Sequence, residues 1–232
     1  MATFVLVHGA WHGAWVWPRT ARLLRDEGHD VFTPTLTGVG ERSHLAGKEV
    51  NLSLHVLDVC NVLRWEGLDD VVLCGHSYGG AVVTGVADAM PERIRALVYL
   101  DAFVPRDGEA IWDYVEPKRA YFLEGAGRHA GRTEPISCEE FNVNPADRAW
   151  VKSKLVPMAL ACFLERIRLT GAVDRLRRTY VYATGWSPSP FTQFHERVRN
   201  DPAWTVRTVG TGHDVMIDDP QACARRLAEA AA

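Results

Sequence analysis

The sequence has few cysteines, and they show no pairing pattern. There are five, an odd number, and no two share a C-x-x-C spacing: Cys60, Cys74, Cys138, Cys162 and Cys223. Disulfide scaffolds and zinc sites are built from closely spaced cysteine pairs. We therefore expect buried thiols in a reducing compartment, and neither a disulfide framework nor a metal site.

Long apolar runs and an excess of one charge are also missing. No run approaches the roughly 20 apolar residues needed to cross a bilayer, and residues 1–7 lack the basic segment and cleavage site of a signal peptide. Lys and Arg total 26 against 29 Asp and Glu, a net charge of −3 over 232 residues. Such a chain has no electrostatic attraction to nucleic acid or to an anionic membrane. We expect a cytoplasmic protein whose partner is a small molecule, and a homodimer is left open.

Short continuous apolar runs alternate with helical segments over the first 105 residues. The runs lie at 4–7, 31–32, 71–74 and 96–100, and the helical segments at 18–27, 52–65 and 78–90. A continuous apolar strand, unlike an alternating one, is buried on both faces, as in a parallel sheet covered by helices. The pattern predicts an α/β fold with a mostly parallel sheet of about six strands.

Between residues 106 and 178 the strand pattern disappears. This stretch mixes polar and aromatic residues, with helical patches at 145–155 and 159–169. Strands resume at 179–184 and 204–209, and a helix over 220–230 ends the chain. Residues 1–105 and 179–232 are therefore expected to form one core, with 106–178 inserted as a small helical lid over the edge where open α/β sheets bind ligands.

The sharpest chemical signal is Gly75-His76-Ser77-Tyr78-Gly79, a G-x-S-x-G pattern between a strand and a helix. A tight strand-to-helix turn exposes the serine as a nucleophile, and the flanking glycines let the neighbouring backbone pass. Ser77 is therefore the candidate nucleophile. The alternative is a glycine-rich turn with an idle serine.

A serine nucleophile needs a base, and nine histidines compete for that role. With this kind of elbow the base comes last in the chain, on a loop after the final strand. His213 lies in such a loop, Gly210-Thr211-Gly212-His213-Asp214, and is the candidate base. The alternative is a solvated loop histidine.

The oxyanion hole should combine the amide after the nucleophile, from Tyr78, with that of Ala10 in the loop after the first strand. His8 and His12 flank that loop, but no carboxylate stands nearby in sequence, so a metal pair is not expected. Gly38-Val39-Gly40 and Gly125-Ala126-Gly127 do not complete a dinucleotide-binding loop. No cofactor is predicted.

Three segments together resemble esterases of the α/β-hydrolase fold, nearest to plant methylesterases, hydroxynitrile lyases and their bacterial relatives. They are residues 4–15, the Gly-His-Ser-x-Gly-Gly elbow and the late Gly-x-Gly-His. The resemblance covers nearly the whole chain and implies Ser77 as nucleophile, His213 as base, and Ala10 and Tyr78 as oxyanion donors. The nitrile lyases carry a threonine where Gly9 stands and a lysine where Asp214 stands, so cyanohydrin cleavage is disfavoured.

The third member of the triad departs from that family. Its aspartate usually follows the strand after the lid, but residues 185–190 of this chain contain no carboxylate. Asp101 follows the strand next after the nucleophile helix, and adjacent strand ends lie roughly 5 Å apart. Pancreatic-type lipases are similar in this respect. Asp101 is the candidate acid and Asp107 a weaker one, the alternative for Asp101 being a cap on the following turn.

We therefore expect a cofactor-free carboxylic-ester hydrolase that acts on small to medium apolar or aromatic esters through an acyl-enzyme. Lactone hydrolysis, a lyase and a small-molecule receptor on the same fold are the alternatives. Five residues are candidates for the substrate pocket, because they lie near strand ends or in the lid: Trp11, Phe103, Trp112, Trp186 and Met216.

Overall fold

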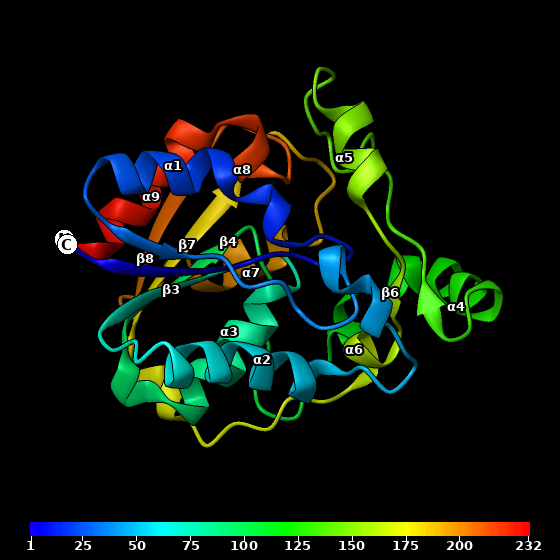
Figure 1. The fold of residues 1–232 in the computed structure, drawn as a ribbon, viewed down its shortest axis with the longest axis horizontal. Coiled ribbons are helices and arrows are strands. Elements are labelled where there is room, and N and C mark those ends of the chain that lie inside the picture. The colour runs from blue at the N-terminus through cyan, green and yellow to red at the C-terminus, as the bar shows by residue number, and fades with distance from the viewer.

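Six parallel strands form one sheet in the computed structural model, which describes residues 1–232 (Figure 1). The order across the sheet is β2-β1-β3-β4-β7-β8. The strands are β1 (Thr3–Val7), β2 (Asp30–Phe32), β3 (Val71–His76), β4 (Ile94–Leu100), β7 (Arg177–Ala183) and β8 (Trp204–Val209). The predicted α/β fold and its number of strands are thus confirmed. The inner strands are continuous apolar runs because helices cover the sheet on both faces.

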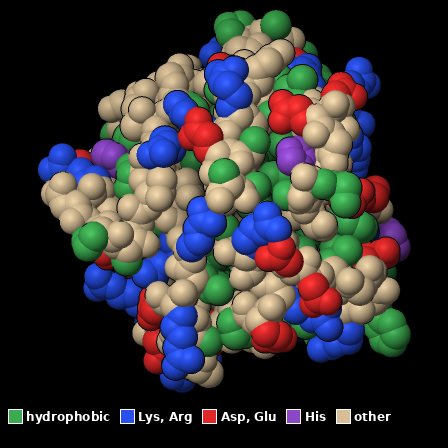
Figure 2. Space-filling model, turned by 90° about the vertical axis from the view of Figure 1, so that its left-hand side faces the viewer, with side chains coloured by type: hydrophobic (Ala, Val, Ile, Leu, Met, Phe, Trp, Pro, Cys, Tyr) green, Lys and Arg blue, Asp and Glu red, His purple; other side chains and the backbone are tan.

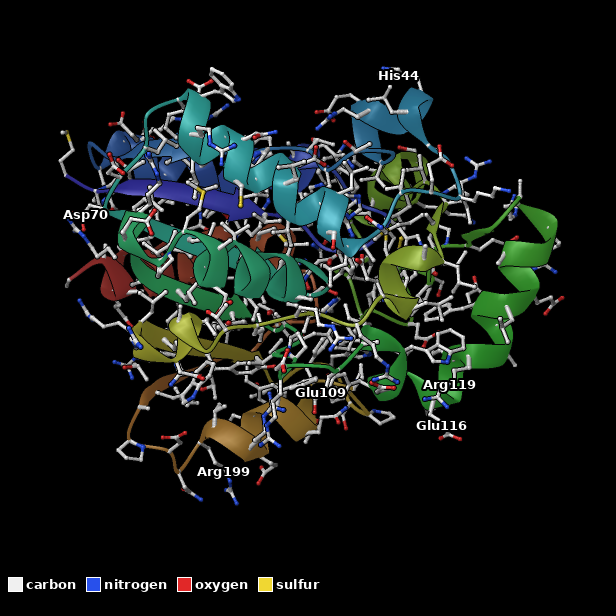
Figure 3. All side chains as sticks on the ribbon, turned by 90° about the horizontal axis from the view of Figure 1, so that it is seen from below. His44, Asp70, Glu109, Glu116, Arg119 and Arg199 are labelled. Atoms are coloured by element: carbon white, nitrogen blue, oxygen red, sulfur yellow. The ribbon has the colours of Figure 1, made fainter.

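Helices α1, α8 and α9 cover one face of the sheet, above it in Figure 1, and α2 and α3 cover the other. Seen from below, α2 and α3 lie side by side on the second face, and α7 lies farther along it, against β7 and β8 (Figure 3). Their bounds are α1 (Pro18–Asp26), α2 (Leu52–Trp65), α3 (Gly79–Ala89), α7 (Thr192–Val198), α8 (Val215–Asp218) and α9 (Pro220–Ala231). The start of α2 is fixed by Asn51, whose side chain accepts a hydrogen bond from the Leu54 amide at 2.9 Å.

The segment between β4 and β7 gathers at the right of Figure 1, beside the carboxyl ends of the strands. Figure 3 places Glu116 and Arg119 at this end of the molecule and Asp70 at the opposite end. The helices of the segment between β4 and β7 are α4 (Arg119–Arg128), α5 (Arg148–Lys154) and α6 (Ala161–Leu164). Its strands are β5 (Arg132–Thr133) and β6 (Met158–Ala159). Six 3-10 turns complete the chain: Ala14–Val16, Gly40–Leu45, Pro91–Arg93, Ile111–Tyr114, Glu116–Lys118 and Ala172–Arg175.

The differences from the expected elements fall mostly in this segment. Helix α4 was not predicted, because Gly125 and Gly127 interrupt its pattern, and the patch at 159–169 shortens to α6. Strand β7 begins at Arg177, within the stretch assigned to the insertion, because Arg177 and Arg178 pair with Ala96 and Leu97 of β4. Sheet pairing there extends the strand through two polar residues that carry no strand signal.

No helix combines the length and the apolar character needed to cross a membrane. All five cysteines are buried free thiols, as expected. Figure 2 shows the face at the left of Figure 1, where lysines and arginines alternate with acidic side chains.

Candidate active site

Ser77 lies at the sharp turn between β3 and α3. Its backbone has φ of +54°, the left-handed region that L-residues other than glycine rarely adopt. The turn is possible only because its neighbours lack a Cβ: one at Gly79 would lie 2.7 Å from the His8 carbonyl oxygen, and one at Gly75 or Gly80 would also collide with backbone. Strain of about 1–3 kcal/mol at such a residue persists where the surrounding structure enforces it. The Ser77 hydroxyl is thereby presented at the carboxyl edge of the sheet.

His213 and Asp101 meet at the same edge. The Nδ1–H of His213 donates to Asp101 Oδ2 at 2.7 Å, and both side chains are almost fully buried. Asp101 directly follows β4, and its Oδ1 accepts from the Ala183 amide at 3.2 Å. Because β4 pairs with β7, the Asp101 carboxylate reaches the histidine loop from the neighbouring strand end. The weaker candidate, Asp107, is exposed and accepts from the Leu169 amide instead.

The surroundings keep His213 neutral. Burial lowers the pKa of His213, and His12 acts in the same direction while Asp214 opposes it. The proton on the neutral ring lies on Nδ1, where Asp101 accepts it, and Nε2 makes no hydrogen bond within the protein. The free Nε2 lone pair is what a general base requires.

Ser77 and His213 both line one cavity of about 550 Å³. Of the expected pocket residues, Trp11, Phe103 and Trp186 line it, as does Ala10. Sequence reasoning missed most of the aromatic wall, which includes Tyr114, Phe122, Phe141, Phe163 and Phe191, and the polar side chains of Lys118, Glu140 and Gln193. Lys118 and Glu140 pair at 2.5 Å. The wall is mainly apolar, so it favours an apolar or aromatic ligand.

Trp112 and Met216 do not line this cavity, and the expected pocket wall is corrected at both positions. The Trp112 ring lies under the Arg119 guanidinium, 5.4 Å from its centre, outside the cavity wall. Met216 is fully buried in α8, because its side chain forms part of the core.

Aromatic rings surround the His213 imidazole. Phe191 stacks on it with ring centres 4.9 Å apart and planes 10° from parallel. Trp186 and Phe141 approach at 4.7 and 5.0 Å. Such packing holds the ring in one orientation.

The two expected oxyanion donors are available. The backbone amides of Ala10 and Tyr78 donate no hydrogen bond within the protein, although both residues are buried. The Tyr78 hydroxyl points elsewhere, to His55 Nδ1 at 2.9 Å. Two unpaired N–H groups in a buried site are suited to stabilise a developing oxyanion.

Two titratable residues beside the predicted base His213, namely His76 and Asp214, were not among the predicted site residues. His76, His213 and Asp214 bring possible metal-ligand atoms within 4.8 Å of one another. However, His76 Nε2 donates to the His213 carbonyl at 3.1 Å, and His213 Nδ1 is bound to Asp101. Hydrogen bonds thus engage one ring nitrogen of each histidine, while His76 Nδ1 has no hydrogen-bond partner within the protein.

Comparisons with known proteins identify relatives of this chain. The sequence model described as the alpha/beta hydrolase family matches residues 4–226. A carbendazim hydrolyzing esterase of Nocardioides sp. (strain SG-4G) is 47% identical over 240 residues, covering 98% of this chain and 99% of that protein. An alpha-hydroxynitrile lyase of Arabidopsis thaliana is 37% identical over 105 residues, 44% of this chain and 40% of the lyase. Among solved structures, an extracellular alpha/beta-hydrolase from a Paenibacillus species has a TM-score of 0.83 at 25% identity, covering 99% of both chains.

Proposed function

Because the chain belongs to the alpha/beta hydrolase family and is an esterase, we propose that it hydrolyses small to medium carboxylic esters bearing an apolar or aromatic group. Ser77 is the nucleophile, His213 the general base and Asp101 the residue that orients the base. Ala10 and Tyr78 supply the oxyanion hole through their amides.

The reaction follows from these positions. Ser77 Oγ attacks the ester carbonyl while His213 Nε2 takes its proton, and the Ala10 and Tyr78 amides bind the oxyanion that forms. Protonated His213 then gives its proton to the leaving alcohol, and an acyl-enzyme remains. Water, activated by the same histidine, releases the acid. Asp101 keeps the proton on Nδ1 throughout, so that Nε2 is the nitrogen that faces Ser77.

One observation carries the proposal: Ser77 and a neutral, Asp101-bound His213 open into the same cavity. The 550 Å³ volume accommodates a drug-sized molecule. Its rings, Trp11, Phe103, Trp186 and Phe191 among them, offer faces and edges for a flat aromatic group. The relative that is 47% identical is named for the hydrolysis of carbendazim, so carbendazim is a candidate substrate of this chain.

The test is hydrolysis of short p-nitrophenyl esters, an aromatic methyl ester and carbendazim by four forms of the protein: wild type, S77A, D101N and D107N. Asp107 provides the matched control because it undergoes the same chemical change outside the site. Wild type and D107N should be equally active, S77A inactive, and D101N slower by up to about 10⁴-fold, as when a triad histidine loses its tautomer control. Folded D101N with wild-type rates would remove Asp101 from the mechanism.

A lactone is an internal ester, so the same residues would open one, and lactones belong in the substrate panel.

A serine-directed phosphonate distinguishes an esterase from a receptor without turnover, because only an activated Ser77 reacts with it. Cyanohydrin cleavage is disfavoured, because the threonine that nitrile lyases carry does not fit at Gly9. A Cβ at Gly9 would lie 2.9 Å from His76 Nδ1 and from Ser77 Cβ.

A further inference from the structure

Three buried titratable residues beside the triad have no role in the proposed reaction: His12, His76 and Asp214. Asp214 Oδ2 lies 3.3 Å from His12 Nε2, and Asp214 Oδ1 lies 3.7 Å from His76 Nε2. His12 is in the loop that carries Ala10, His76 precedes the nucleophile, and Asp214 follows the base. One carboxylate therefore contacts residues from all three catalytic segments.

The hydrogen bonds of His12 reveal its protons. Its Nδ1 lies 2.6 Å from the Ala10 carbonyl oxygen, and its Nε2 faces Asp214. A carbonyl oxygen and an ionised carboxylate can only accept, so both ring nitrogens must donate, and a ring with two N–H groups is an imidazolium. A protonated Asp214 is the other arrangement. Burial acts to raise the Asp214 pKa, but His12, His76 and His213 prevail and hold it below the usual range.

The position of this ring matters because of the peptide groups around Ala10. The Gly9 carbonyl shares its peptide with the Ala10 N–H, and it accepts from His8 Nδ1 at 2.8 Å. The Ala10 carbonyl, in the next peptide, accepts from His12. The two histidines thus fix both peptide planes that flank Ala10, ahead of Trp11, whose φ is +64°. A strained turn of this kind needs such external support.

The geometry points to a positioning role for His12 and Asp214: a buried imidazolium–carboxylate pair that holds the Ala10 amide in its oxyanion-binding direction and ties that loop to the loop of His213. This role rests on the proposed function of Ala10 and His213. It explains why Asp214 stays buried although it does not contact the His213 ring nitrogens. Trp15 and Phe141, with rings 5.3 and 6.2 Å from that of His12, exclude water from the pair. The titratable groups facing the pair are His8, His76, His213, Asp101, Cys138 and Asp218.

The first test is independent of turnover. ¹⁵N NMR of histidine-labelled wild type at pH 7 should show one ring, identified by its loss in H12Q/D214N, with both nitrogens protonated. A single proton on the His12 ring overturns the proposal. H12Q alone leaves a buried carboxylate without its cation and can unfold the chain, so the double variant, which removes both charges, is used for the assignment.

The second test uses activity. In D214N the imidazolium loses its counter-charge and the Ala10 amide is no longer held toward the oxyanion, so kcat should fall about 10-fold with KM unchanged. A general packing defect would instead raise KM and lower the urea midpoint together with kcat. D219N is the matched control, because Asp219 caps α9 and asparagine caps equally well. Folded D214N with the kcat of wild type overturns the positioning role. If wild type does not react with the serine-directed phosphonate, the proposed function is contradicted, whatever the NMR shows.

Discussion

Three residues of the site have a left-handed backbone although none is glycine. Trp11, Ser77 and Asp101 have φ of +64°, +54° and +42°. Each conformation costs about 1–3 kcal/mol and is maintained by neighbouring hydrogen bonds. Asp101, for example, is held by its amide, which donates to the Val181 carbonyl at 2.7 Å. Strain at the proposed oxyanion loop, nucleophile and acid is what a preorganised site requires.

The buried environment of His213 predicts an unusual pH dependence of activity. Burial lowers its pKa from 6.5 to about 3. As the proposed base, His213 works as neutral imidazole, so a lower pKa of His213 moves the acidic limb of the pH profile to lower pH. We expect kcat/KM for p-nitrophenyl acetate to stay level from pH 7.5 down past pH 6.5, and to fall only in more acidic buffer. Half-maximal kcat/KM at pH 6.5 or above, in protein that circular dichroism shows to be folded, would contradict this assignment.

At the scale of elements, α3 is fitted to the elbow through small residues. Gly80 lies in its first turn, where a Cβ would collide with the Phe103 carbonyl oxygen in the loop after β4. Gly127 in α4 has open space around the position of its missing Cβ. The same residue type therefore serves close packing in one helix and has no packing role in the other.

This contrast predicts opposite results for one substitution. G80A should lower the free energy of unfolding by about 1–3 kcal/mol or displace the elbow with loss of activity, because the Cβ meets rigid backbone. G127A should raise stability by about 0.5–1 kcal/mol, since alanine loses less backbone entropy in a helix. Urea unfolding of both variants measures the difference. Equal stabilities would show that the Phe103 carbonyl can move away.

At the scale of the whole molecule, the cavity lies between the sheet and the segment inserted between β4 and β7. Its lining comes from the loop after β1, the elbow, the loop after β4, the inserted segment and residues 186–193.

The core beside the cavity contains several neutral histidines. Burial lowers the pKa values of His8, His55, His76 and His213.

These buried histidines make stability depend on pH. Their folded pKa values lie below the unfolded value of 6.5, so the unfolded chain binds more protons below pH 6.5, and stability falls as the pH falls. His8 and His213, each lowered to about 3, should each cost about 2 kcal/mol between pH 6.5 and 5. Urea midpoints from pH 7 to 5 test this. H213N should reduce the slope by about one proton, and H44N, at an exposed histidine, should leave it unchanged. Wild-type stability that is level over this range would contradict the neutral state of the histidines.

Much of the fold followed from local patterns. The apolar runs placed β1, β3 and β4 to within a few residues, because burial on both faces of a sheet leaves a continuous signature. The limits of α2 matched because Asn51 provides a cap that can be read from sequence. Helices α7 and α8 were missed, since short helices are decided by what they pack against, and α4 was missed because two glycines interrupt its pattern.

The sequence by itself determined the elbow, its serine and the late histidine, because strand, turn and helix signals each lie within a few neighbouring residues. It also offered Asp101, but only the pairing of β4 with β7 brings that carboxylate to 2.7 Å from His213. Tertiary structure alone decided which aromatic residues face the cavity, which excluded Trp112 and Met216. It also brought His12 to Asp214 across 202 positions of sequence, because contacts between distant loops depend on how the strand ends meet and leave no local pattern.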